Sequence, residues 1–318
     1  MYQLNIILSV ILILFHAFFY LVLPILIKNS ILWSLCSISF ILLTTTYWSL
    51  IHDCTHMSFN PEKKINFGFG RIMSIFFLSP FYLLRLGHLL HHRLNRTPID
   101  TSEANSGKFY YYFRLSIGLF LQELSGNLLI FLPKKYIYQF AKKQGNNIPE
   151  IEKIILSNLK NRLMETNVTS TRIDAIFILL LIFITFWLYG EHWLILLASL
   201  TGRGFIVSVS DNSYHYNTKL NLAKSGRNLY LPRLGELLIL NFNLHNVHHN
   251  YPNVPWWQLP VYFKKLNASY DLGYIKSALL QLTCPQFTYH VSIFSAAYCG
   301  NLCAKILCEL HCRSADTA

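Results

Sequence analysis

The stretch that decides the fold is NIILSVILILFHAFFYLVLPILIKNSILWSLCSISFILLTTTYWSLI, from Asn5 to Ile51. It contains two apolar runs, Asn5 to Ile27 and Ile31 to Ile51, joined by the short polar turn Lys28-Asn29-Ser30. A helix needs about 20 apolar residues to cross roughly 30 Å of hydrocarbon, and each run is long enough. The stretch therefore predicts a transmembrane helical hairpin. We expect the first run to be a retained helix rather than a signal peptide, because no basic region precedes it.

A second hairpin is predicted much later in the chain. Ile173 to Tyr189 is apolar, Gly190-Glu191-His192 forms a turn, and Trp193 to about Val209 is apolar again. The predicted spans are thus 5–27, 31–51, 173–189 and 193–209 in one domain covering residues 1–318. Segments 52–172 and 210–318 are expected to be cytoplasmic or interfacial.

Two further apolar stretches, Ile65 to Leu86 and Phe109 to Leu132, differ from the spans because they contain charged and strongly polar side chains. These side chains are Arg71, Arg85, Arg114, Gln122 and Glu123. Tyrosines also gather there, and an aromatic ring with a polar tip suits the headgroup region. We therefore interpret both stretches as interfacial or re-entrant helices.

Composition and charge agree with a membrane protein. The chain is 53% hydrophobic and only 13% charged, with a mean hydropathy of +0.34, which is too apolar for an ordinary soluble domain. Of the 27 Lys and Arg residues, 16 lie in 52–172 and nine in 211–318, so 25 lie on one predicted side of the membrane. The positive-inside rule makes that side the cytoplasm. The basic excess is better explained by cytoplasmic loops and anionic lipids than by nucleic acid, which we do not expect as a partner.

The seven cysteines form no paired pattern of a secreted disulfide scaffold, so we expect reduced thiols. Four of them, Cys299, Cys303, Cys308 and Cys312, lie near His311 in a short tail. A metal site there is conceivable, but no C-x-x-C pair occurs. We prefer a partly helical tail with incidental cysteines.

Eight of the 13 histidines fall in three short clusters. The first, His52-Asp53-Cys54-Thr55-His56, follows the second predicted span, and its i, i+4 spacing places both imidazoles on one helix face. The other two share an H-x-x-H-H pattern, which presents three ring nitrogens in one direction. Their histidines are His88, His91 and His92 in one cluster, and His245, His248 and His249 in the other.

The predicted topology places all three clusters on the same side of the membrane. Imidazole-rich sites suit iron, zinc or copper, and eight ligands are too many for one tetrahedral zinc, so two metal ions are implied. Adjacent histidines near a membrane would otherwise leave several half-buried polar groups without partners, which is costly. The isolated histidines His16, His192, His290 and His311 are instead expected to be hydrogen-bonded core or interfacial residues.

A ninth candidate ligand, His215, follows the fourth predicted span. Asp211 lies four residues earlier on the same helix face and could bind metal directly, bind it through water or orient a ligating imidazole. Capping of a helix end is the alternative role for Asp211. Further candidates for hydrogen-bonding the ligating imidazoles are Asp53, Asn246 and Asn250.

The three clusters resemble the histidine boxes of the membrane fatty acid desaturase superfamily and of its hydroxylase and ketolase relatives. The similarity lies in H-D-C-T-H, in G-H-L-L-H-H-R and in H-N-V-H-H-N-Y-P-N-V-P-W, and it covers roughly His52 to Pro260. It implies a helical cap over two irons, an acyl-chain channel and a separate electron carrier. It also implies a metal ligand at His215, although family members have asparagine where this chain has Asp211. No His-Pro-Gly-Gly motif occurs, so we expect no fused cytochrome b5 domain.

The expected fold is therefore an all-α integral membrane protein with four transmembrane helices in two hairpins and a cytoplasmic helical cap that holds a di-metal site. The preferred function is O2-dependent di-iron desaturation of an acyl chain, with a ferredoxin- or cytochrome-type electron donor. Hydroxylation or ketolation of a lipid or carotenoid by the same centre is the main alternative. A metal transporter is disfavoured because the clusters lie outside the spans, and a non-catalytic scaffold is the remaining hypothesis. The acyl carrier is left open among lipid, coenzyme A and acyl carrier protein.

Overall fold

The computed structural model describes residues 1–97, 100, 108–132, 168–219 and 225–283. This part of the chain is predominantly helical, as predicted. Its one sheet pairs two short parallel strands, β1 (Leu229–Tyr230) and β2 (Leu272–Gly273). The tail considered as a conceivable metal site, with Cys299, Cys303, Cys308, Cys312 and His311, lies outside the described residues, as do Cys284 and His290.

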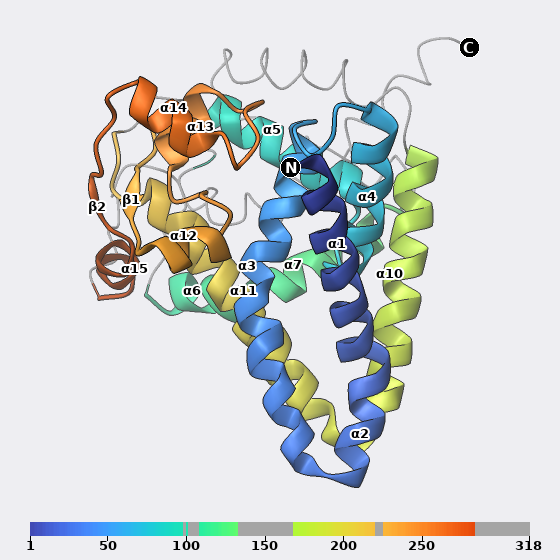
Figure 1. Cartoon of the computed structure of the whole chain (residues 1–318). Helices are drawn as coiled ribbons and strands as arrows, with labels where there is room; N and C mark the ends of the chain where they lie inside the picture. The colour runs from blue at the N-terminus through green and yellow to red at the C-terminus, as the bar shows by residue number, and fades with distance from the viewer. Residues whose placement is uncertain (98–99, 101–107, 133–167, 220–224, 284–318) are drawn as a thin grey trace.

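The first predicted hairpin is a pair of long helical stretches. The first comprises α1 (Tyr2–Ala17), the π-helical turn η1 (Phe18–Val22) and α2 (Leu23–Asn29). The π turn ends two residues before Pro24, which cannot donate a backbone hydrogen bond to the preceding turn. After an extended residue at Ser30, η2 (Ile31–Leu35) leads into α3 (Cys36–Thr55). In Figure 1, α1 and α2 run down the molecule and α3 returns beside them.

The second predicted hairpin consists of α10 (Val168–Tyr189), the short η4 (Gly190–His192) and α11 (Trp193–His215). Gly190 has a φ of +52°, a left-handed conformation that glycine adopts without strain. The chain reverses direction there, and Figure 1 shows α10 descending and α11 returning toward the top of the molecule. Three helical stretches in the described chain are long and apolar enough to cross a membrane, Tyr2–Asn29, Ile31–Thr55 and Val168–His215. The last of these contains both the third and the fourth predicted spans.

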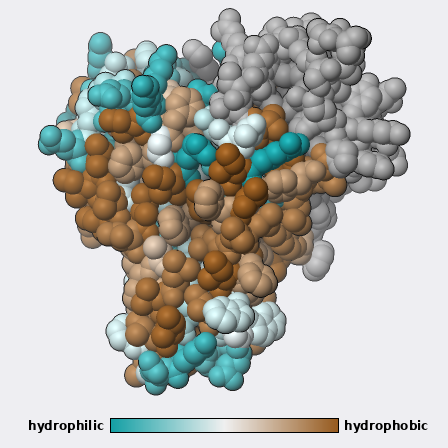
Figure 2. All heavy atoms as spheres, turned by 90° about the vertical axis from the view of Figure 1, so that its right-hand side faces the viewer, coloured by the Kyte–Doolittle hydropathy of each residue, from teal (hydrophilic) through white to brown (hydrophobic). Residues whose placement is uncertain are grey.

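The outer surface of these helices is apolar. Leu14, Leu42, Phe183 and Trp187 are each at least 60% exposed, which a water-facing surface rarely tolerates over a continuous area. In Figure 2, apolar residues cover most of the coloured part of this face, and hydrophilic residues gather at its upper and lower ends. This distribution is that of a protein embedded in lipid.

The two stretches expected to be interfacial or re-entrant form short helices. The first gives α4 (Lys63–Phe76) and α5 (Phe81–Leu94), which meet at a bend of 102° just before α5. This bend is incompatible with a single straight span. Gly70 permits the close approach of the two helices, because a Cβ at that position would overlap the ring of Phe81. The second stretch gives α6 (Lys108–Phe113), η3 (Arg114–Gly118) and α7 (Leu119–Leu129).

The remaining helices are short, and the last of them packs against the end of α11, where Ser277 donates to the carbonyl of Ser213. They are α12 (Arg233–Leu238), α13 (His245–Asn250), α14 (Leu259–Lys265) and α15 (Tyr274–Thr283). A buried hydrogen-bond bridge joins this region to α1: Asn5 donates to the carbonyl of Phe59 and accepts from the indole of Trp256, both at 2.9 Å. The apolar core continues from Leu50 and Cys54 of α3 to Val247 of α13. These contacts place α13 against the end of α3.

Candidate metal centre

Nine histidines from four helices converge on one region. The end of α3 and the residue after it contribute the first cluster, α5 the second, α13 the third, and the last residue of α11 contributes His215. They are the nine residues that the sequence singled out: His52, His56, His88, His91, His92, His215, His245, His248 and His249.

The nine imidazoles divide into two groups, and within each group the ligand atoms lie within 4.8 Å of one another. The five-histidine group contains His52, His56, His88, His92 and His248. The four-histidine group contains His91, His215, His245 and His249. The groups adjoin, because the rings of His92 and His249 are stacked with centroids 4.3 Å apart.

Helical spacing explains this division. In each cluster the i, i+4 pair enters the same group, because such residues lie above one another on one helix face. The i+3 residue of each H-x-x-H-H cluster, His91 or His248, enters the other group. The three imidazoles of each of these clusters therefore do not point in one direction, as their sequence spacing suggested, but divide between the two groups.

The distances between ring nitrogens fit metal coordination. Six Nε2–Nε2 separations lie between 2.8 and 3.1 Å, such as 2.8 Å for His88 and His56 and 2.9 Å for His215 and His245. Nitrogens bound at about 2.1 Å to one ion are separated by about 3.0 Å in an octahedron and about 3.4 Å in a tetrahedron. The observed separations are close to the octahedral edge, so neighbouring nitrogens within a group could bind one ion.

Burial favours the neutral form of most of these imidazoles, which is the form that binds metal. Burial lowers the pKa of His56 to about 3, and it also lowers the pKa of His245 and His248. Both ring nitrogens of His52 are buried and have no hydrogen-bond partner in the described structure. A buried imidazole in this state is costly unless something binds it, so the donor set fits bound metal ions.

Sequence reasoning missed Asp100, which accepts a 2.6 Å hydrogen bond from Nδ1 of His91. Although burial alone disfavours a charged imidazole, this carboxylate raises the pKa of His91. The bond turns Nε2 of His91 toward the four-histidine group. The corresponding partner of His215 is the carbonyl of Ser225, 3.2 Å from its Nδ1. Asp100 follows the end of α5, where no helical periodicity links it to His91, so no pattern could have identified it.

Replacing Asp100 by Ala is expected to reduce turnover by about 10- to 100-fold, because the partner of a ligating histidine fixes the ring's tautomer and direction. Asp100→Asn retains an acceptor oxygen and should recover a substantial part of that loss. Initial rates and bound metal per chain should be measured together. Equal rates in the wild type and in Asp100→Ala would contradict the assigned role.

The other residues that the sequence suggested as hydrogen-bond partners of the metal-binding imidazoles do not all lie beside the rings. Asp211 lines both cavities described below. Asp53 accepts hydrogen bonds from the Ser58 side chain and the Trp256 backbone. Asn246 donates to the carbonyl of Gly226, and Asn250 donates to Asn246. These three residues hold the chain around α13 in place.

The isolated histidines lie away from the centre. His16 stacks on Tyr47 at a centroid distance of 3.9 Å and donates to the carbonyl of Leu12. His192 is partly exposed at the turn between α10 and α11. Both therefore match the expectation of core or surface residues.

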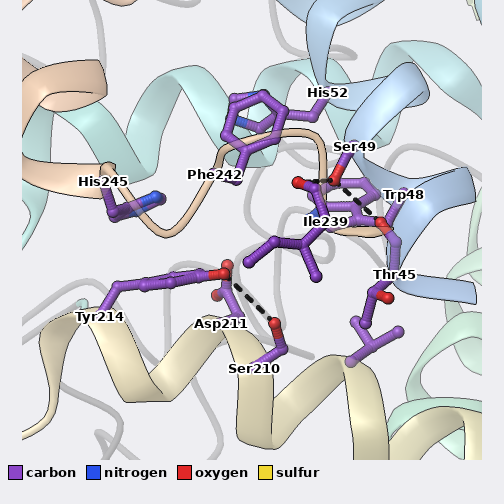
Figure 3. A pocket seen from close by; sticks show the side chains of 11 residues that line it. Thr45, Trp48, Ser49, His52, Ser210, Asp211, Tyr214, Ile239, Phe242 and His245 are labelled. Carbon is purple, nitrogen blue, oxygen red and sulfur yellow. Dashed lines mark hydrogen bonds between the residues drawn. The ribbon is translucent and has the colours of Figure 1, made fainter. Parts of the chain in front are cut away.

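Two cavities adjoin the histidines. The smaller has a volume of about 20 Å³ and lies between α3, α11 and the segment before α13. In Figure 3, His52 and His245 lie on one side of it and Asp211 and Tyr214 on the other. It therefore touches one histidine from each group.

The larger cavity has a volume of about 260 Å³ and borders His88 and His91. Its walls are mostly apolar and are formed by α5, η3, α7 and α11. Trp48, Val207 and Asp211 line both cavities, so the two volumes adjoin at these side chains. An apolar space beside clustered imidazoles suits a hydrocarbon chain.

The fatty acid desaturase family model matches residues 28–277, which include all nine histidines. The chain belongs to this family. Membership makes it a membrane oxidoreductase, and the paired histidine groups are consistent with a metal centre.

Curated relatives are similar at low identity. A fatty acid desaturase of Bacillus subtilis is 23% identical over 235 residues, which cover 68% of this chain and 63% of the relative. An sn-1 oleoyl-lipid 12-desaturase of Arthrospira platensis is 23% identical over 246 residues, 71% of this chain and 66% of the relative. A ferredoxin-dependent sn-1 acyl-lipid omega-3 desaturase of Synechocystis is 35% identical over 75 residues, 23% of this chain and 21% of the relative. The chain thus spans less than two thirds of these relatives' lengths. No solved structure matches it.

Proposed function

We propose that this chain is an acyl desaturase in which the nine histidines hold two iron ions, one in each group. The observation that carries the proposal is the pair of adjoining imidazole groups, with nitrogen separations near the octahedral edge, beside a mostly apolar cavity. Iron accepts five or six ligands, so a five-histidine group suits it better than zinc, which is usually four-coordinate.

The reaction removes one hydrogen from each of two neighbouring methylenes. With O2, two electrons and two protons, a –CH2–CH2– unit becomes –CH=CH– and two molecules of water form. The chemistry that the two irons would supply here is oxidation by O2, which no side chain can perform on an unactivated methylene.

The protein's own residues position and shield the reactants. Neutral, buried imidazoles hold the metal ions, and Asp100 orients His91. Trp48 and Phe242 flank the small cavity between the two groups and help to exclude water from it. The apolar walls of the larger cavity would align a methylene chain next to His88 and His91.

We further propose that the substrate is an acyl chain carried by a lipid and that the electron donor is a separate ferredoxin- or cytochrome-type protein. The names of the relatives support this, because two of the three described above are an acyl-lipid and an oleoyl-lipid desaturase, and the name of the acyl-lipid enzyme specifies ferredoxin. A chain delivered from the bilayer would also suit the exposed apolar surface of the helices.

The proposed membrane arrangement has four spans in two hairpins, with the histidines and the short helices forming a cytoplasmic cap within a single domain of residues 1–318. The two reversals, at 28–30 and 190–192, both lie at the end of the molecule away from α13 (Figure 1), which supports this arrangement. Bilayer insertion in this orientation would expose the centre to a cytoplasmic donor.

Expression of the chain in a bacterial host that lacks it is expected to produce acyl chains lighter by two hydrogens. The measurement is mass spectrometry of total lipids, compared with the same host carrying His245→Ala. Gain of one oxygen instead would favour a hydroxylase or ketolase with the same centre. Identical lipid profiles for the two strains, with the protein present in membranes, would refute acyl oxidation in that host.

A further inference from the structure

Helix α15 is amphipathic in the sense opposite to that of a helix on the surface of a water-soluble protein. Its polar side chains face inward, because Ser277 and Gln281 are 0% exposed and donate to backbone carbonyls of α11 at 2.8 and 2.7 Å. Its large apolar side chains face outward, with Ile275 64% exposed and Leu279 52% exposed. A helix in water buries its apolar stripe and exposes its polar face. The outer face of α15 therefore suits an apolar surrounding.

Helix α12 also turns its apolar side chains outward. Its three leucines, Leu234, Leu237 and Leu238, are 72%, 41% and 50% exposed. Their i, i+3 and i+4 spacing places them on one face of the helix. On the inner side, the hydroxyl of Thr46 on α3 donates to the carbonyl of Leu238. The attachment of α12 to the long helices is thus polar, and its free face is apolar.

The two helices lie in the same part of the molecule. Helix α12 begins three residues after β1, and α15 directly follows β2. Because these strands pair in parallel, both helices leave the sheet at the same end. Figure 1 shows α12 and α15 on the same side, below α13 and α14.

Both helices lie at the depth where the predicted spans end. Thr46 lies five residues before the end of the second span at Ile51, which corresponds to about 8 Å along the α3 axis. Val209, whose carbonyl accepts the hydrogen bond from Gln281, is the last residue of the fourth span. The headgroup layer adds only about 5 to 8 Å on each side of the hydrocarbon. The outer faces of α12 and α15 are therefore level with the boundary between headgroups and acyl chains.

Lipid is the occupant that the surroundings of these faces favour. Leu42, one helical turn before Thr46 on the same face of α3, is 60% exposed and belongs to the apolar surface of the long helices. The surface that meets acyl chains at Leu42 thus continues onto α12. Each helix also carries an exposed basic residue, Arg233 on α12 and Lys276 on α15. Basic residues beside an apolar helix face are typical of helices that lie on anionic leaflets.

We propose that α12 and α15 are interfacial membrane helices, whose outer faces bind acyl chains of the adjoining leaflet and whose Arg233 and Lys276 contact anionic headgroups. The inference rests on the membrane arrangement of the proposed function and goes beyond it, because it places two helices of the cap inside the leaflet rather than in water. The helices that they pack on, α3 and α11, enclose the small cavity beside the histidines. Lipid held by α12 and α15 is therefore close to the metal centre.

Fluorescence quenching of bimane on single cysteines tests this position. The whole chain, with its native cysteines replaced, is reconstituted in vesicles of phosphatidylcholine and phosphatidylglycerol whose acyl chains are plain or brominated. Leu234→Cys and Leu279→Cys probe the proposed faces, and Leu42→Cys is the lipid-facing control. Val261→Cys is the matched water-facing control, because Val261 on α14 is 61% exposed and α14 lies farther from the spans. Brominated lipid should quench the first three severalfold more than Val261→Cys, and aqueous iodide should show the reverse order.

The controls separate failure of this inference from failure of the proposed function. Strong quenching of Leu42→Cys by brominated lipid, with Leu234→Cys and Leu279→Cys quenched by iodide as strongly as Val261→Cys, would overturn the interfacial helices alone. Protection of both probes from both quenchers would also overturn them, because protein would then cover these faces, and light scattering in detergent would identify a second copy. Lipid quenching at both probes in a chain without desaturase activity would support the inference and count against the proposed reaction.

Discussion

Turnover is expected to fall by more than about a hundredfold when either His88 or His245 is replaced by Ala, because each belongs to a different histidine group and oxidation needs both. The two variants should differ in metal content. His88→Ala leaves four imidazoles in its group and should still bind close to two irons per chain. His245→Ala leaves only three in its group, so iron should fall toward one per chain. Rates and iron per chain are measured on the same anaerobically reconstituted samples.

His192→Ala is the matched control, since His192 is partly exposed at the turn between α10 and α11. It should keep most of the wild-type turnover and iron. His16→Ala should also keep activity, but it removes a ring stacked on Tyr47 and therefore lowers stability, so it is the weaker control. Wild-type rates in His88→Ala or His245→Ala would contradict the two-group centre, as would one zinc ion and no iron after anaerobic reconstitution.

The sequence predicted the members of the centre because local geometry determines them. An i, i+4 spacing on a helix fixes which imidazoles share a face, whatever the rest of the fold does. The apolar runs predicted the long helices from their length alone, because about 20 apolar residues are needed to span the bilayer. His52 and His56, for example, needed only one helix to be placed together.

The sequence could not predict which histidine belongs to which of the two groups, because that depends on contacts between segments far apart in the chain. His91 joins histidines of α11 and α13, and His248 joins histidines of α5 and of the first cluster, so neither stays with its own i, i+4 pair. The bond between His91 and Asp100 and the pairing of Arg203 with Glu123 join residues 9 and 80 positions apart. No periodic pattern relates such residues. In the sequence, Glu123 served only as one of the charged side chains that distinguish its segment from a transmembrane helix.

Asn5 illustrates a second limit of prediction from a single sequence. The sequence made it the first residue of a membrane span, where a polar amide has little significance. The structure uses its side chain to bridge Phe59 and Trp256, 54 and 251 residues away. Single-sequence reasoning could not foresee this, because both partners lie in segments whose positions follow only from the assembled fold.

Thiol labelling from outside the cell should distinguish the residues on the two sides of the membrane, and it therefore tests the proposed topology. In a variant whose native cysteines are replaced, single cysteines at Asn29 and Glu191 should react with a membrane-impermeant thiol reagent in intact cells. Cysteines at Arg93 and Asn217 should react only after the cells are opened. Asn29, Glu191 and Asn217 are exposed in the structure, so a lack of labelling would reflect the membrane rather than burial.

The length of the helices is the physical reason for expecting this labelling pattern. From Trp193 to His215, α11 extends about 33 Å along its axis, more than the roughly 30 Å of hydrocarbon that a span must cross. Its two ends therefore face opposite sides if it crosses the bilayer. Metal–nitrogen bonds of about 2 Å cannot join groups across that distance, so His91 and His215 require Arg93 and Asn217 to share one side. Labelling of Arg93 and Asn217 from opposite sides would rule out a shared centre.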